Sequence, residues 1–128
     1  MPHFTIEYSA NLESKVEIGG LCDHVLVAAL KTGMFETGAV RVRAIRCDHY
    51  AIADQARENS FIDVSLRLAS GRDLALRQSA GAAIFAEMSA FLAPLFEDQH
   101  FALSFELREI NPLLSFKKNS IHERLRPR

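Results

Sequence analysis

Hydrophobic and polar residues alternate from the start of the chain. In the segment 3–8, His-Phe-Thr-Ile-Glu-Tyr, every second residue is apolar, which groups Phe4, Ile6 and Tyr8. Successive side chains of a β-strand point to opposite faces, so this spacing predicts a strand with one buried face. The predicted strand starts almost at the N-terminus.

Beyond a polar turn over 9–14, apolar residues recur at intervals of three and four, which predicts a helix that ends near Gly33. Its buried positions are predicted to be Leu21, Val25, Ala28 and Ala29. A second extended stretch follows from Val40, in which Arg41 and Arg43 alternate with apolar residues and share one face. The first half therefore reads as strand, helix, strand.

The second half repeats this order. A strand is predicted at Val64, Leu66 and Leu68, and it ends at a polar turn over 70–73, where Asp73 is placed to cap the next helix. That helix is predicted from the spacing of Ala80, Ile84, Met88, Phe91, Leu92 and Leu95, with Pro94 near its end. The last predicted strand alternates Phe101, Leu103, Phe105 and Leu107 with polar or small residues.

Two such units can share one sheet. We therefore predict an α+β fold, a two-layer sandwich of two β-α-β units with both helices on one face. The whole chain, 1–128, is expected to form a single domain whose halves are about 1–57 and 58–128. The strands also carry scattered apolar residues on their second face, so self-association is expected to cover it.

Composition and net charge restrict the kinds of partner that the chain is expected to bind. The chain has 128 residues, of which 48% are hydrophobic and 24% charged, and its formal net charge is −1. No overall field favours nucleic acid, and no segment approaches the roughly 20 apolar residues that a membrane span needs. We expect a cytoplasmic protein that binds neither nucleic acid nor membrane. The basic tail over 117–128 is expected to be solvated or to pack on a neighbouring subunit.

The cysteines and histidines do not point to a metal. Cys22 and Cys47 lie far apart with no CxxC spacing, and the five histidines are scattered without HxH or HxxxH patterns. We therefore expect two free thiols and neither a metal nor a cofactor.

The candidate for chemistry is Pro2. Methionine aminopeptidases remove Met1 before a small residue, which leaves a secondary amine at the N-terminus. An α-amino group titrates at about 7.7–8.0, and burial or nearby cations lower that pKa, so the amine can serve as an uncharged base. Proline at this position is common and carries little weight alone. Here the strand that starts next to it would hold its nitrogen in place.

Two arginines add to this signal. Arg41 opens the strand after the first helix, and Arg72 lies in the glycine-containing turn before the second helix, both at element ends where side chains can converge. Guanidinium groups bind carboxylates through paired hydrogen bonds, although surface or intersubunit ion pairs would explain these arginines equally well. Arg43, Arg46 and Arg67 are less well placed and are assigned to such ion pairs.

At this point the chain resembles the 5-carboxymethyl-2-hydroxymuconate isomerase family of the tautomerase superfamily, which also includes 4-oxalocrotonate tautomerase and macrophage migration inhibitory factor. The resemblance covers essentially the whole length. It is carried by Pro2-His3-Phe4, Gly38-Ala39-Val40-Arg41, Ala69-Ser70-Gly71-Arg72, Leu76-Arg77-Gln78, Ala102-Leu103-Ser104-Phe105-Glu106, Asn111-Pro112 and Ser115-Phe116-Lys117-Lys118-Asn119. The segment 47–59 carries little that matches the family.

The resemblance implies a homotrimer in which Pro2 is the catalytic acid and base, while Arg41 and Arg72 bind the substrate carboxylates and polarise the oxo group. The implied reaction moves a proton on a small tricarboxylate in homoprotocatechuate (4-hydroxyphenylacetate) breakdown, without a cofactor. Two alternatives stay open. A proline-dependent tautomerase of a phenylpyruvate-like monoacid would tolerate charge reversal at one of the two arginines. A non-catalytic trimeric binding module would tolerate Pro2→Ala.

Overall fold

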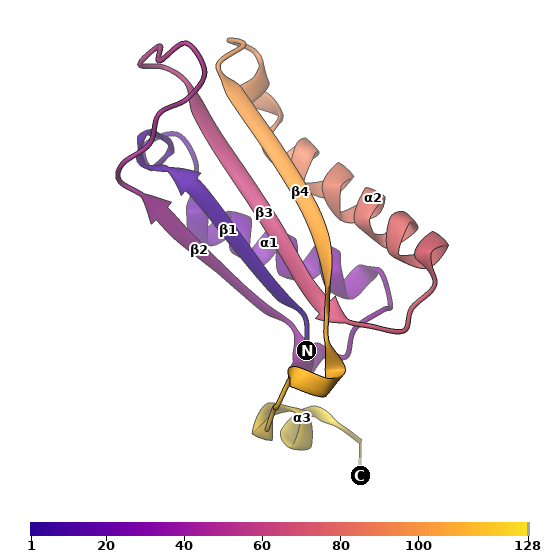
Figure 1. The fold of residues 1–128 in the computed structure, drawn as a ribbon. Helices are drawn as coiled ribbons and strands as arrows, with labels where there is room; N and C mark the ends of the chain where they lie inside the picture. The colour runs from indigo at the N-terminus through magenta and orange to yellow at the C-terminus, as the bar shows by residue number, and fades with distance from the viewer. Residues whose placement is uncertain (128) are drawn as a thin grey trace.

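The computed structural model describes residues 1–127 and consists of one four-stranded sheet with helices on one face (Figure 1). The strands are β1 (His3–Ser9), β2 (Arg41–Cys47), β3 (Ser60–Ala69) and β4 (Phe101–Ile110), and the helices are α1 (Ile18–Lys31), α2 (Leu74–Phe91) and α3 (Ser120–Leu125). The strand order across the sheet is β2-β1-β3-β4. The predicted succession of two strand-helix-strand units is confirmed.

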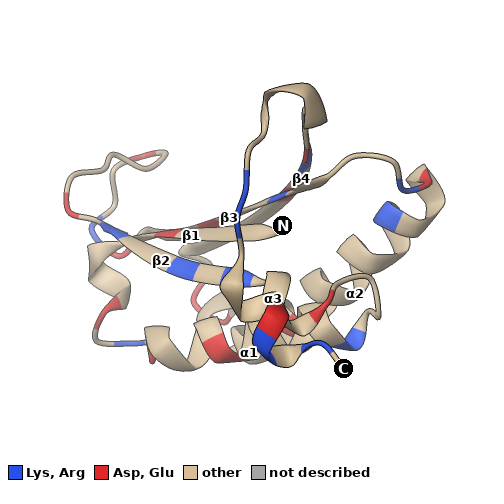
Figure 2. Cartoon of the chain, turned by 90° about the horizontal axis from the view of Figure 1, so that it is seen from below, with Lys and Arg blue, Asp and Glu red and all other residues tan. Residues whose placement is uncertain are grey.

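The pairing directions follow from the two crossovers. Helix α1 connects β1 to the parallel strand β2, and α2 connects β3 to the parallel strand β4. The two units meet where β1 and β3 run antiparallel. Both long helices lie on the same side of the sheet, as predicted (Figure 2). This arrangement places the start of β1 beside the start of β2 and the end of β3.

The core lies between the sheet and these two helices. The inward face of β1 is buried at Phe4, Ile6 and Tyr8, as its alternation predicted. Most of the other predicted apolar positions are also buried: Leu21, Val25, Ala28, Ala29, Val64, Leu66, Leu68, Ala80, Ile84, Met88 and Leu92. Five more are half-buried and pack against this core: Leu95, Phe101, Leu103, Phe105 and Leu107. Phe91 remains 38% exposed. No helix in the described part of the chain is long and apolar enough to cross a membrane.

The predictions for the ends of α2 are partly confirmed. Asp73 occupies the N-cap position, as predicted, but its side chain makes no capping hydrogen bond, and its main-chain carbonyl accepts the N–H of Arg77 as the first hydrogen bond of the helix. The second helix ends at Phe91 and not near Leu95. Pro94 lies at the start of a separate 3-10 turn, because its ring removes a backbone donor and restricts the residue before it.

The uncovered face of the sheet is more polar than expected. Strand β1 presents Thr5 and Glu7 there, and β3 presents Asp63 and Ser65 opposite them. Apolar exposure is concentrated elsewhere, in the segment after β4, where Leu113, Leu114 and Phe116 are between 76% and 92% exposed.

The C-terminal tail packs on its own subunit. Helix α3 contacts the 3-10 turn η2 (Thr37–Ala39), and the Asn119 side chain donates to the carbonyl of Gly38 at 2.9 Å. Arg126 forms a two-point ion pair with Glu36, with N···O distances of 2.8 and 2.9 Å. These contacts bring residues 119–126 back beside the N-terminus, so this part of the tail is not simply solvated, whereas its packing on a neighbouring subunit stays a prediction (Figure 1).

Candidate active site

Pro2 lies at the edge of the core where three strands meet. It is buried, and its carbonyl accepts a hydrogen bond from the main-chain N–H of Arg41 at 3.1 Å. The ring is thereby tied to the start of β2 as well as to β1. Met1 precedes it in this structure, so the free amine is the one on Met1. A residue held in this way can present its nitrogen in a fixed position once it becomes the terminus.

A cavity of about 500 Å³ opens beside Pro2, and both Pro2 and Arg72 line it. The Arg72 guanidinium donates to the carbonyl of Met34 at 2.9 Å and to that of Ala69 at 3.3 Å. It also lies over the Phe35 ring, 5.3 Å from the centroid. These contacts fix the guanidinium and leave it without a carboxylate within salt-bridge distance in residues 1–127. The geometry suits an anion receptor.

The turn that carries Arg72 is itself braced. Gly71 has a φ of +108°, a conformation that L side chains rarely adopt, and its N–H donates to the Glu109 carboxylate at 3.3 Å. The same carboxylate pairs with Arg77 at 3.5 Å, and Arg77 Nε donates to the Arg72 carbonyl at 3.1 Å. This network sets the direction in which Arg72 leaves the backbone.

Arg41 is placed differently from the prediction. It does open β2 next to Pro2, but its Nη1 donates to the carbonyls of Gly38 at 2.9 Å and Val40 at 3.3 Å. Among the described residues it lines neither the cavity beside Pro2 nor the larger one described below. Pro2 and Arg72 therefore share a cavity, whereas the Arg41 guanidinium is turned toward nearby backbone.

The electrostatic environment lowers the pKa of the terminal amine. Burial is the largest cause, followed by the Lys117 ammonium, which also hydrogen-bonds the amine, and then by the charges of Arg72 and Arg41. Both effects disfavour the protonated amine. The charges of Lys117, Arg72 and Arg41 thus all lower the pKa of the terminal amine, although Arg41 does not line the cavity.

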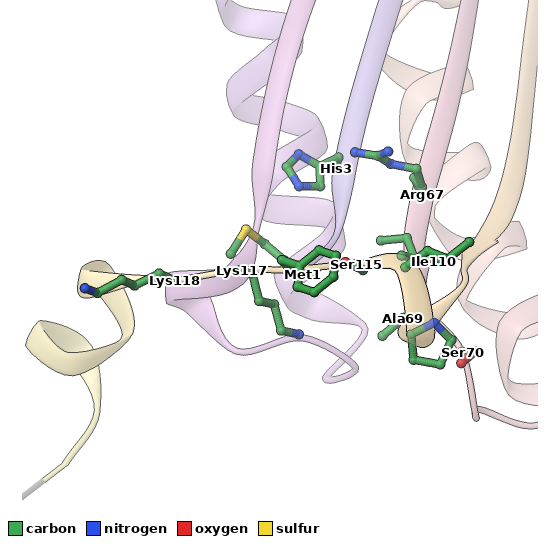
Figure 3. Close-up of a pocket in the computed structure, with 12 residues that line it drawn as sticks. Met1, His3, Arg67, Ala69, Ser70, Ile110, Ser115, Lys117 and Lys118 are labelled. Atoms are coloured by element: carbon green, nitrogen blue, oxygen red, sulfur yellow. The ribbon is translucent and has the colours of Figure 1, made fainter.

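A second and larger cavity, of about 760 Å³, lies on the uncovered face of the sheet beside Met1 (Figure 3). Its walls include His3, Arg67 and Lys117. Arg67 forms no ion pair within its own chain, because no carboxylate lies within 4.0 Å of it in residues 1–127, and an ion pair with a neighbouring subunit stays a prediction. Arg46 does form the expected surface pair, with Asp48 at 2.9 Å, while Arg43 contacts the His3 ring at 3.2 Å.

Sequence reasoning missed Lys117. It lines both cavities and hydrogen-bonds the terminal amine. The family-like segment 115–119 pointed to this region, but a charge-rich tail is ordinarily solvated, and the pattern alone could not show that it folds back over the N-terminus.

Two β-α-β units in one sheet, with a proline immediately before the first strand, are the fold of the tautomerase superfamily, which the similarity to solved isomerase structures at 30% and 32% identity supports. The family model for 5-carboxymethyl-2-hydroxymuconate isomerase matches residues 2–125, and the chain belongs to this family of isomerases. The chain is 34% identical over 122 residues to the 5-carboxymethyl-2-hydroxymuconate Delta-isomerase of Escherichia coli, covering 95% of this chain and 97% of that protein.

Solved structures of isomerases of this family have the same fold as this chain. A 5-carboxymethyl-2-hydroxymuconate isomerase from Deinococcus radiodurans R1 superposes with a TM-score of 0.91 at 32% identity, covering 98% of this chain and 95% of that one. A more distant likeness, a fused 4-OT wild-type symmetric trimer, has a TM-score of 0.59 at 15% identity, with coverage of 84% and 85%. This second likeness concerns the fold alone.

Proposed function

We propose that this protein isomerises 5-carboxymethyl-2-hydroxymuconate, as its family does, with the nitrogen of Pro2 as the base and acid after Met1 is removed. In this proposal Arg72 binds the 2-hydroxy acid end of the substrate, and Arg41 contributes charge to the same site. The observation that carries the proposal is the shared cavity of Pro2 and Arg72, next to the Met1 amine, whose pKa is lowered by burial and cations.

The chemistry follows from a neutral amine next to a fixed cation. The Pro2 nitrogen takes the proton of the 2-hydroxyl group, and the electron pair left on oxygen develops into a dienolate. Arg72 stabilises this negative charge more than it stabilises the neutral enol, so it lowers the barrier and not only the binding energy. The protonated ring then returns the proton to a carbon of the conjugated chain, which yields an unsaturated 2-oxo acid with no net change in atoms or electrons.

The test combines intact mass with an ultraviolet assay of enol loss. Mature protein is expected to lack Met1 and to consume the enol. Pro2→Ala also allows removal of Met1, so it isolates the contribution of the ring nitrogen, and we expect it to lower kcat by about 10²–10⁴-fold. Active protein that retains Met1 would rule out the free-amine mechanism. Unchanged activity in Pro2→Ala would favour a role in which the fold serves binding alone.

We propose further that the protein acts as a homotrimer in the cytoplasm. The likeness to a symmetric trimer supports the assembly, as does the apolar side chain of Leu113, which is 83% exposed and which another subunit would cover. Two free, half-buried thiols, Cys22 and Cys47, fit a reducing compartment. Multi-angle light scattering should give three times the mass of one chain, and a monomer at micromolar concentration would contradict the trimer.

A further inference from the structure

Four basic residues lie in one row across the uncovered face of the sheet. The strand register sets Arg41 beside His3, His3 beside Arg67, and Arg67 beside Arg108. Like charges directly opposite each other on neighbouring strands destabilise a sheet. Such a row therefore requires either internal partners or an external anion.

Internal partners account for all but one member of the row. Arg41 donates to backbone carbonyls, and Arg108 Nε donates to Glu106 at 2.7 Å. His3 contacts Arg43, and burial together with the neighbouring arginines lowers the pKa of His3, which favours its neutral form. Arg67 is exposed and makes neither a hydrogen bond nor a salt bridge through its side chain to any residue in 1–127.

The free guanidinium lines the larger cavity. Figure 3 shows Arg67 reaching from β3 toward the His3 ring, with Met1 and Lys117 beside them. Lys118 contributes a further cation to the wall, and no Asp or Glu lines the cavity within the described part of the chain. A hollow of this size with only positive charges is suited to carboxylates.

Met1 separates this cavity from the one that contains Arg72. Met1, Ala69 and Lys117 line both hollows. Pro2 lines the hollow that contains Arg72, and Met1 lines both that hollow and the one that contains Arg67. Once Met1 is removed, we expect the two hollows to form one elongated cleft.

We propose that Arg67 is a specificity-determining residue, which binds a carboxylate at the end of the substrate remote from the 2-hydroxy acid group. The inference rests on the proposed function, because it assigns a second anchor within the same site. A planar guanidinium binds a carboxylate through two parallel hydrogen bonds, and an unpartnered one has no internal ion pair to break first. The site thereby prefers substrates with carboxylates at both ends.

The kinetic test compares two enols in the mature trimer. One is 5-carboxymethyl-2-hydroxymuconate, and the other is the enol of phenylpyruvate, which lacks a remote carboxylate. Arg67→Gln should raise KM for the first by about 10–100-fold with kcat within about twofold, and should change kcat/KM for the second by less than about threefold. Arg67→Lys should recover part of the loss. The matched control is Arg57→Gln, an exposed arginine in the segment between β2 and β3, at the opposite end of the sheet.

A binding measurement keeps the subsite distinct from the reaction. Calorimetry with the inert propane-1,2,3-tricarboxylate should show binding to the wild type and to Arg57→Gln, and at least fivefold weaker binding to Arg67→Gln. If the wild type binds this probe through Arg67 but turns over neither enol, the isomerase proposal fails and the subsite stands. Absent binding, equal kinetic losses on both enols, or dissociation of the trimer by Arg67→Gln with no change in discrimination would each overturn the subsite.

Discussion

The carbonyl of Pro2 accepts the main-chain N–H of Arg41 at 3.1 Å, so the residue that the proposed mechanism makes terminal is hydrogen-bonded to the first residue of β2. A terminal residue without such a partner would fray, because chain ends lose little by moving. Here the proline is buried and held from two strands. In the proposed mechanism, these contacts would hold the terminal nitrogen in a fixed position.

The first prediction concerns pH. Burial and the cations Lys117, Arg72 and Arg41 lower the pKa of the Met1 amine below its ordinary value of 8.0, and we expect the Pro2 amine, one residue along in the same surroundings, to be lowered in the same direction. Only the neutral amine accepts a proton, so kcat/KM should rise with pH through this lowered pKa and then level off. Lys117→Met removes a neighbouring charge and should move the rising limb to higher pH. The limb is measured from kcat/KM between about pH 5 and 9.

The control for that shift is Lys15→Met, an exposed lysine at the opposite end of the sheet. It should leave the limb in place. A limb that moves equally in both variants would reflect the net charge of the protein and not the contact between Lys117 and the terminus.

The second prediction concerns Arg72. Its replacement by alanine removes a guanidinium that is held by the carbonyls of Met34 and Ala69 and by the Phe35 ring. Charge-assisted hydrogen bonds contribute about 1.5–3 kcal/mol, so we expect Arg72→Ala to lower kcat/KM by about 10–100-fold. Steady-state assays on the tricarboxylate provide the measurement.

Arg124→Ala serves as the comparison for Arg72→Ala, because this exposed residue of α3 lines neither cavity near Met1. It should stay within about twofold of the wild type. Equal losses in the two variants would argue against carboxylate binding by Arg72 and would favour a monoacid substrate.

The third prediction concerns the docking of the tail at low pH. The hydrogen bonds and charge of Arg126 lower the pKa of Glu36. The pair therefore stabilises the docked tail above the ordinary Glu pKa, and this contribution is lost as the pH falls through the lowered value. Hydrogen exchange of residues 120–125 should stay slow until that pH and then speed up. Glu36→Gln should show the faster exchange at neutral pH, and identical exchange in the variant would mean that the pair does not hold the tail.

The fold could be predicted because its periodicities were local. Alternation gave the buried face of β1, and three-four spacing gave the buried positions of α1. Helix ends were less predictable, since a proline can start a new turn after a helix, as Pro94 does. The division into halves about 1–57 and 58–128 stays a prediction.

The site was only partly predictable, because sequence spacing does not show where a side chain turns. Arg41 and Arg72 were chosen as element ends, yet only Arg72 lines a cavity with Pro2, because nearby carbonyls hold the Arg41 guanidinium. Arg67 was assigned to a surface or intersubunit ion pair, since spacing alone does not show which residues lie beside it on the neighbouring strands. Lys117 depends on a contact between the two ends of the chain, which no local pattern encodes.

The last prediction concerns Gly38, where α3 packs against η2. A Cβ at Gly38 would lie 3.1 Å from both the backbone nitrogen and the Cα of His122, and backbone atoms cannot rotate away. Helix α3 is short and largely exposed, so we expect Gly38→Ala to displace it without disturbing the core. Exchange in residues 119–125 should increase markedly, while the free energy of unfolding changes by less than about 1 kcal/mol.

Gly81→Ala is the matched control for this displacement. Its Cβ would approach Leu107 Cδ1 at 3.1 Å, but that is the end of a side chain, which can rotate, and alanine favours helix α2 by about 1 kcal/mol over glycine. Exchange in residues 119–125 should stay at the wild-type rate in this variant. Lys117 precedes α3 and lowers the pKa of the terminal amine. Gly38→Ala should therefore also shift the rising limb of the kcat/KM profile to higher pH, as Lys117→Met does. If hydrogen exchange in residues 119–125 increases but the pH profile of kcat/KM does not shift, Lys117 keeps its position without the docking of α3.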